Sequence, residues 1–228
     1  PQAVAFHPFR GEAYVSNFSN GTVSIIDTDR GELRTTVAAG PLPAGIAVSA
    51  SGHRLYVVNA QEQGTLTVLD TADFHTVATI PVGEHPSSVA VDPQRNRVYV
   101  TNRSKPGDRR PCLLHPVVFC DVQVTLIDSD ANEAIGGIAV GDELGGIDLS
   151  PREPHLYVLG RFPVEGTARW VFATLDLDNL SVLRRLPLST FPTSTAVHPD
   201  GGRAYVSTAD GVSVVDLVRD RIAGQLLA

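Results

Sequence analysis

An all-β fold built from repeated four-stranded units is predicted by three features of the 228-residue sequence. First, a short motif centred on tyrosine occurs five times, at 13–17, 55–59, 98–102, 156–160 and 204–208. Second, each motif is followed by a β-rich run that ends in aspartate, at Asp27, Asp70, Asp128, Asp176 and Asp216. Third, no segment keeps an apolar period of about 3.6 residues, so we expect no substantial helix.

The spacing of these features shows that most of the repeated unit has a fixed length. From each aspartate to the next motif tyrosine the distance is 29 residues in all four cases. From the tyrosine to the aspartate of the same unit, the distance varies from 11 to 29 residues. All length variation therefore falls in one connection of the unit, between its second and third strands.

The third unit shows how the four strands are assigned. We expect its strands at 88–91, 97–101, 123–127 and 133–140, where Val, Ile, Tyr and Thr dominate and apolar and polar residues partly alternate. Turn residues punctuate the units, as at Asp92-Pro93. Four short strands that repeat about every 40 to 45 residues are typical of a β-propeller blade. The sequence thus predicts one β-propeller over 1–228, with blades near 3–43, 45–86, 88–145, 146–192 and 194–228.

Composition narrows the class of protein. Hydrophobic residues make up 43% of the chain, which is ordinary for a globular protein and too high for a disordered one. No run approaches the ~18 to 20 apolar residues of a membrane span. The formal net charge of -7 argues against a nucleic-acid binder, which is normally basic. We therefore expect neither a nucleic-acid partner nor a membrane span.

The segment Tyr99-Val100-Thr101-Asn102 is the tetrapeptide that names the YVTN β-propeller repeat family. The surrounding pattern also resembles that family's unit, with a Val-rich strand that ends in Asp and a Gly-x-x-Pro stretch such as 83–86. The resemblance covers essentially the whole chain and weakens in the last two units, where Gly160 and Thr208 replace the Asn.

This resemblance implies a WD40-like propeller, usually of seven blades, found in surface-layer proteins and many secreted bacterial proteins. It is similar to the propellers of nitrous-oxide reductase, cytochrome d1 and amine dehydrogenases. Five blades are visible in this chain. We expect them to be a section of a larger ring, with a small five-bladed ring as the alternative.

The two ends of a four-stranded meander differ. The hairpins between the first and second strands and between the third and fourth strands turn at one end, which we call the turn end. The second-to-third connections and the crossovers to the next blade lie at the other, which we call the loop end. Insertions in repeat proteins often map to the binding face, and loops on a rigid scaffold commonly carry function. We therefore expect any ligand site at the loop end.

Ionisable residues gather in the predicted loop-end segments. The largest connection, 102–121, and the next, 160–170, both carry several Arg, which favour anionic groups through forked hydrogen bonds. Arg in long surface loops also serves solubility, and this alternative holds for any single one of them. The candidate ligand-binding residues are Arg103, Arg109, Arg110, His115, Arg161, Arg169, His85 and Glu84.

Cysteine and histidine give little sign of a metal site. Cys112 and Cys120 most simply form a disulfide that staples the inserted loop, which would stabilise it by about 2 to 3 kcal/mol and implies an oxidising compartment. The alternative is a reduced pair that binds metal with His115, but this set lacks a fourth ligand. Five of the seven His fall in turn-end segments, and only His85 and His115 share the loop end. No metal site is predicted.

The residues that recur in every unit have structural explanations. An Asp at the end of a strand caps the following turn by bonding the backbone two residues on. A structural role is also expected for the asparagines that start loops, Asn17, Asn59 and Asn102. Repetition in each blade also argues for a scaffold role, since an active site is usually unique.

These observations favour a non-enzymatic, extracytoplasmic binding module that presents its loop end to a protein, a glycan or an anionic small molecule. The alternative is the propeller of an enzyme: a redox enzyme with a haem, quinone or copper partner such as a fused or separate cytochrome, or a lactonase or lyase. No cofactor is expected within this chain, which lacks the C-x-x-C-H motif, a P-loop, G-x-S-x-G and H-E-x-x-H. No catalytic residue is assigned.

Overall fold

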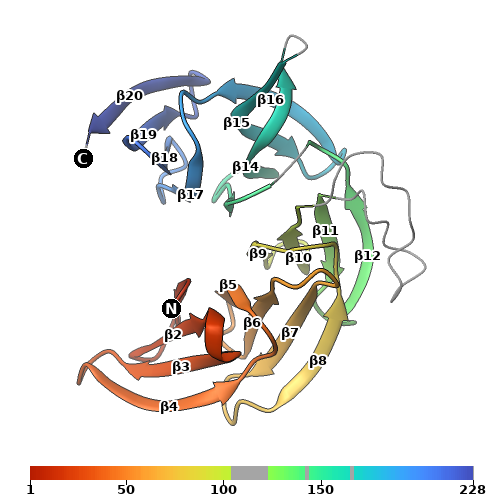
Figure 1. The fold of residues 1–228 in the computed structure, drawn as a ribbon, viewed down its shortest axis with the longest axis vertical. Coiled ribbons are helices and arrows are strands. Elements are labelled where there is room, and N and C mark those ends of the chain that lie inside the picture. The colour runs from red at the N-terminus through yellow and green to blue at the C-terminus, as the bar shows by residue number, and fades with distance from the viewer. Residues whose placement is uncertain (104–122, 142–143, 165–166, 228) are drawn as a thin grey trace. The chain divides into compact units, whose positions relative to one another are not determined.

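A computed structural model describes residues 1–103, 123–141, 144–164 and 167–227, and it consists of five four-stranded antiparallel sheets, the blades of a β-propeller (Figure 1). In each sheet the strands pair in chain order, as a meander. The one helical element among the described residues is the short 3-10 helix η1, Phe18–Asn20.

The strands are as follows. Blade 1 holds β1 (Val4–Phe6), β2 (Glu12–Asn17), β3 (Thr22–Asp27) and β4 (Glu32–Ala38). Blade 2 holds β5 (Pro43–Val48), β6 (Arg54–Asn59), β7 (Thr65–Asp70) and β8 (Thr76–Pro81). Blade 3 holds β9 (Ser88–Asp92), β10 (Arg97–Thr101), β11 (Val124–Asp128) and β12 (Glu133–Ile138). Blade 4 holds β13 (Ile147–Leu149), β14 (His155–Val164), β15 (Thr167–Asp176) and β16 (Ser181–Pro187). Blade 5 holds β17 (Pro192–Val197), β18 (Arg203–Thr208), β19 (Gly211–Asp216) and β20 (Arg221–Leu227).

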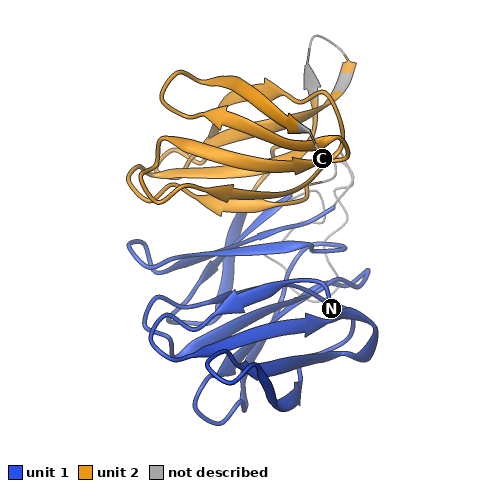
Figure 2. Cartoon of the chain, turned by 90° about the vertical axis from the view of Figure 1, so that its left-hand side faces the viewer, with its two compact units in different colours: residues 1–137 blue, residues 138–228 orange. Residues whose placement is uncertain are grey.

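The chain divides into two compact units (Figure 2). Unit 1, Pro1–Gly137, contains blades 1 to 3, and unit 2, Ile138–Ala228, contains blades 4 and 5.

Apolar faces of successive blades pack together within each unit. In unit 1, Tyr14 and Ile25 of blade 1 meet Leu55 and Leu69 of blade 2, and all four side chains are fully buried. A similar cluster joins Tyr56 and its neighbours on blade 2 to blade 3. In unit 2, the corresponding cluster between blades 4 and 5 includes Tyr157, Phe172 and Val206. The motif tyrosine thus belongs to the layer between blades.

The first strands of neighbouring blades approach so closely that a side chain does not fit between them. A Cβ atom on Gly45 would lie 2.7 Å from Ser88 Cα, and the Gly45 N–H donates to Ser87 O at 3.1 Å. In unit 2, a Cβ on Gly146 would lie 3.1 Å from Ser194 Cα. Glycine is used here for close backbone approach.

The predicted strands of the third unit are confirmed to within two residues, and β10 has the predicted bounds. The connection expected at 160–170 is different, because this segment continues the strands β14 and β15 as a long hairpin. Arg161 pairs with Trp170 and Phe162 with Arg169. Phe162, Val164, Thr167 and Trp170 favour strands, whereas Gly160, Pro163 and Ala168 in the same hairpin do not, so local preference leaves this extension open.

No helix in the described part of the chain is long and apolar enough to cross a membrane.

Candidate functional site

The loop end of unit 1 is held together by backbone hydrogen bonds between successive connections. The Arg103 N–H donates to Glu84 O at 3.0 Å, and the His85 N–H donates to Gln61 O at 2.9 Å. These bonds join the second-to-third connection of blade 2, the crossover to blade 3 and the end of β10. Three of the predicted site residues are therefore placed together on one fixed backbone platform.

The side chains on this platform are accessible to a ligand. Arg103 and His85 are exposed and Glu84 is half-buried. The Arg103 guanidinium makes no ion pair with any residue that the structure describes. An exposed guanidinium is the group that a forked hydrogen bond to an anion needs.

The loop end of unit 2 separates two of the predicted residues. Because Arg161 pairs with Trp170 and Arg169 pairs with Phe162, their side chains leave opposite faces of the β14–β15 hairpin. Both arginines are exposed, and neither forms an ion pair within the described ranges. The two residues cannot act as one forked clamp without bending the hairpin.

An aromatic pair beside Arg161 is not anticipated by the sequence. Trp170 and Phe191, which lies in the crossover to blade 5, meet edge to face with their ring centroids 4.8 Å apart. Phe191 remains 46% exposed. The only sequence signal is a Phe-Pro pair, 191–192, in the segment that corresponds to Gly-x-x-Pro in other blades. Arg161 and these rings offer a charged and an apolar contact on one face of the hairpin.

Several predicted residues lie outside the described part of the chain. These are Arg109, Arg110, His115, Cys112 and Cys120. The disulfide and the largest predicted cluster of arginines therefore stay predictions. Among the described residues, no group of three or more His, Cys, Asp or Glu side chains is arranged to hold a metal ion.

The five repeated aspartates cap the turns between third and fourth strands, as predicted. In each blade, the aspartate Oδ1 accepts the N–H of the residue two positions on, at 2.7 to 3.2 Å. In blade 3, Asp128 also forms an ion pair with Arg97 across the strands at 2.7 Å. The backbone N–H groups of Ala131 and Asp130, followed by Arg97, hold the pKa of Asp128 below its usual value. These carboxylates are part of the scaffold.

The repeated asparagines clamp the loop end of their blades. Asn59 Nδ2 donates to Thr65 Oγ1 at 3.0 Å and to Thr67 Oγ1 at 2.8 Å, and Asn102 makes a matching bond to Thr125. Each packs against a glycine of the preceding crossover, since a Cβ on Gly40 would lie 2.6 Å from Asn59 Nδ2. The structural reading of these residues is confirmed.

One row of side chains departs from the repeat, and it lies in blade 4. In each blade a cross-strand row runs through the motif tyrosine, and we call it the Tyr row. The row reads Ala5–Tyr14–Ile25–Thr35 in blade 1, Ala47–Tyr56–Val68–Ala78 in blade 2, Ala90–Tyr99–Leu126 in blade 3 and Ala196–Tyr205–Val214–Gly224 in blade 5. In blade 4 it reads Asp148–Tyr157–Thr174–Arg184. The positions of Asp148 and Thr174 are therefore Ala and an aliphatic residue in the other blades, and the position of Arg184 is Thr, Ala or Gly in blades 1, 2 and 5.

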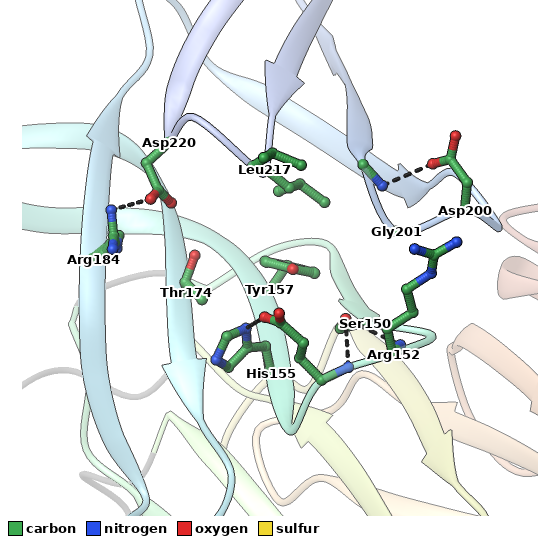
Figure 3. A pocket seen from close by; sticks show the side chains of 13 residues that line it. Ser150, Arg152, His155, Tyr157, Thr174, Arg184, Asp200, Gly201, Leu217 and Asp220 are labelled. Carbon is green, nitrogen blue, oxygen red and sulfur yellow. Dashed lines mark hydrogen bonds and ion pairs between the residues drawn. The ribbon is translucent and has the colours of Figure 1, made fainter.

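Three residues of the Tyr row of blade 4, Tyr157, Thr174 and Arg184, line a cavity of about 610 Å³ at the turn end of unit 2, between blades 4 and 5 (Figure 3). Tyr157 lies near its centre, with Arg184 and Asp220 on one side and Arg152 and Asp200 on the other (Figure 3). Leu217 and Val218 supply apolar surface from blade 5. The groove between blades 2 and 3 is smaller, about 390 Å³, and among the Tyr-row residues of blade 2 only Tyr56 reaches it.

Most charged groups around this cavity already have a polar partner. Arg184 forms an ion pair with Asp220, and Glu153 Oε2 contacts His155 Nδ1 at 2.9 Å. Asp200 Oδ1 accepts the Gly202 N–H at 2.7 Å and contacts His198. Arg152 is the exception, because it forms no ion pair with a described residue.

Asp148 is half-buried, and its carboxylate is held by backbone N–H groups. Its carboxylate accepts the Val197 N–H at 2.7 Å and the Leu149 N–H at 2.8 Å, and so it joins β13 to β17. Burial raises the pKa of Asp148 above its usual value, although the two N–H groups oppose this shift. Burial likewise raises the pKa of Tyr157, which keeps the phenol protonated at neutral pH. The sequence alone contained this signal, since Asp148 stands nine residues before the motif tyrosine, where the other units have Ala.

Comparisons with known proteins support the fold alone. A chain of hydrazine synthase from Kuenenia stuttgartiensis is similar in structure, with a TM-score of 0.59 and 17% sequence identity over 94% of this chain and 76% of that chain. No family model matches the chain, and no curated protein matches it in sequence. The structural similarity is to a propeller, and the YVTN resemblance stays an expectation.

Proposed function

We propose that this chain is a non-enzymatic binding module that holds an anionic ligand or partner at its loop end. The observation that carries this proposal is that arginines at the loop end are exposed and have no ion-pair partner among the described residues. Arg103, Arg161 and Arg169 are exposed at loop ends and have no carboxylate partner among the described residues. At the turn end Arg54 and Arg97 are engaged by aspartates, while Arg152 and Arg203 form no ion pair with a described residue. A free guanidinium forms charge-assisted hydrogen bonds worth about 1.5 to 3 kcal/mol each with an anion.

The aspartate and asparagine side chains that recur in the blades form hydrogen bonds within their own blades. The residues that could bind a partner are therefore the non-repeated ones at the loop end. The partner is a protein, a glycan or a small molecule with an anionic group. Arg109, Arg110 and His115 belong to the same proposed surface through their place in the sequence. The loop that carries them is proposed to be stapled by a Cys112–Cys120 disulfide in an extracytoplasmic compartment.

Heparin is a suitable probe for this surface, because it presents many sulfate and carboxylate groups. We expect it to bind the native chain, and we expect Arg103→Ala to weaken binding by about tenfold, the equivalent of one charge-assisted hydrogen bond. Arg161→Ala and Arg169→Ala, tested separately, are expected to lower affinity less. The binding should weaken as salt is added.

Arg30→Ala and Arg219→Ala are matched controls, because they remove the same charge from exposed arginines of the turn end. Equal losses in these controls would show that net charge alone governs the binding, and the proposed surface would be wrong. Absence of heparin binding at low salt would also contradict it. A thiol assay that titrates two free cysteines in the native protein would contradict the proposed compartment.

A redox-enzyme propeller is the second candidate, favoured by the structural similarity to a chain of hydrazine synthase. In that case a haem, quinone or copper partner would act beside the propeller, because the 228 residues contain no C-x-x-C-H motif. Copurification of the chain with a protein that absorbs visible light would favour this candidate over the binding module.

A further inference from the structure

We infer that the cavity between blades 4 and 5 is a binding site for an uncharged polyhydroxylated molecule, such as a monosaccharide or a cyclitol. This inference goes beyond the proposed function, because the cavity lies at the turn end of unit 2 rather than at the loop end. It rests on the residues that line the cavity, on the balance of charge among them, and on the difference between the Tyr row of blade 4 and those of the other blades.

The first argument is that the scaffold does not require these polar residues. At the position of Thr174, blades 1, 2 and 5 have an aliphatic residue, and at the position of Arg184 they have Thr, Ala and Gly, none of which is charged. Thr174 is 8% exposed, and its hydroxyl forms no hydrogen bond with any described residue. The Thr174 hydroxyl oxygen is not among the fully buried atoms that lack a partner, so it is open to water or to a ligand. Thr174 lines the cavity, so that water or ligand would sit there.

The second argument concerns charge. Arg184 is paired with Asp220, and Glu153 contacts His155, which leaves Arg152 as the one arginine of the lining without an ion pair to a described residue. Paired groups still have free N–H donors and free oxygen lone pairs. A hydroxyl group is both a donor and an acceptor, so several hydroxyls on one molecule can use both kinds of group. An anion would meet three carboxylates around the cavity, those of Glu153, Asp200 and Asp220.

The third argument is the volume of the cavity and the combination of apolar and polar side chains that line it. A volume of about 610 Å³ falls within the usual range for small-molecule sites, which is about 300 to 1,000 Å³. Leu217, Val218 and the ring of Tyr157 give apolar surface for the C–H groups of such a molecule. The unpaired guanidinium of Arg152 stands opposite Arg184 across Tyr157 and adds donors from the other side (Figure 3).

The test is ligand-observed saturation-transfer NMR with the whole chain and a panel of D-glucose, D-mannose, N-acetyl-D-glucosamine and myo-inositol. Citrate and L-alanine serve as anionic and zwitterionic comparators. We expect transfer to at least one of the uncharged molecules. Thr174→Val should weaken its affinity by about tenfold, the loss expected when one buried hydrogen bond is removed, and Thr174→Ser should retain it. Arg152→Ala should also weaken it.

Ser129→Ala is the matched control, because Ser129 lines the equivalent groove between blades 2 and 3. It should leave the affinity unchanged. Thr174→Val places the aliphatic residue of the other blades in the row, so its thermal midpoint should equal or exceed that of the native chain. The inference is overturned if none of the four molecules binds, if only citrate or L-alanine binds, or if affinity is unchanged in both Thr174→Val and Arg152→Ala. None of these results depends on heparin binding at the loop end.

Discussion

At the scale of single residues, the turn between the third and fourth strands has a fixed backbone conformation. The residue four positions after each repeated aspartate has a positive φ, from 49° to 69°, at Gly31, Phe74, Asn132, Leu180 and Asp220. Only blade 1 fills this position with glycine. The four other blades tolerate a strained residue there, which shows that the turn and its cap determine the conformation.

Gly31→Ala is therefore expected to lower the free energy of unfolding by about 1 kcal/mol, the cost of placing a side chain in the left-handed region. A Cβ at Gly31 meets no atom within 4 Å, so steric contact plays no part. Gly224→Ala is the control, because its Cβ also meets nothing and its φ is ordinary. Urea denaturation should show Gly224→Ala to be neutral or slightly stabilising, and equal losses in the two variants would contradict this explanation.

Asn59 offers a second prediction at this scale. Asn59→Ala removes two hydrogen bonds at a position that is 1% exposed, so it should destabilise the chain by about 1 to 3 kcal/mol. Asn17→Ala removes two similar bonds in blade 1, where the side chain is only half-buried and water can replace them. Thermal unfolding should show a clearly larger drop in the midpoint for Asn59→Ala than for Asn17→Ala. The reverse order would contradict a stabilising role for the Asn59 hydrogen bonds.

At the scale of elements, the capped turns make the stability of the chain depend on pH. The pKa of Asp128 is below its usual value in the folded chain, so the unfolded chain binds more protons in the interval between the two values. The stabilisation is complete above the ordinary pKa of about 3.9 and is lost as the pH falls through the folded value. Asp176 and Asp216 shift in the same direction.

Asp128→Ala should lower the thermal midpoint at neutral pH, and its deficit relative to the native chain should shrink as the pH is lowered below about 4. Asp130→Ala, in the same turn, is the control, because the Asp130 carboxylate accepts no hydrogen bond from a described residue. A deficit that persists at low pH would mean that Asp128 acts through something other than its ionised cap.

The elements also show which features a sequence can predict. The bounds of β10 and the aspartate caps followed from local signals, a β-rich run and a carboxylate at its end. The hairpin at 160–170 was missed because an insertion between strands gives no local sign of whether it forms a loop or a longer strand pair. The site around Thr174 was missed for a different reason. Its residues come from three strands and three turns, and they converge only after the two blades pack.

At the scale of the whole molecule, the first blade exposes a face that other blades bury. A row of paired residues, Phe6–Ala13–Ile26–Leu33, crosses blade 1 on the side away from blade 2. Phe6 is 66% exposed and Leu33 is 62% exposed. In blade 2 the central positions of this row, which correspond to Ala13 and Ile26, are Leu55 and Leu69, and both are fully buried against blade 1.

Leu55→Ala should therefore destabilise the chain by about 2 to 5 kcal/mol, as expected for a large-to-small change in a packed core. Phe6→Ala should cost less than about 1 kcal/mol, because most of the ring is already in water. Chemical denaturation of the two variants measures both values. A loss for Phe6→Ala as large as that for Leu55→Ala would show that another sheet or a partner covers this face.

The central claim is that a repeated scaffold carries one specialised blade, blade 4. Amide hydrogen exchange of the whole chain, with and without the panel of uncharged sugars and inositol, tests this claim most directly. We predict slower exchange on ligand addition in segments 150–157, 174–184 and 200–220, and no change in the equivalent segments of blades 2 and 3. No change around the Tyr row of blade 4, or equal changes in all blades, would contradict it.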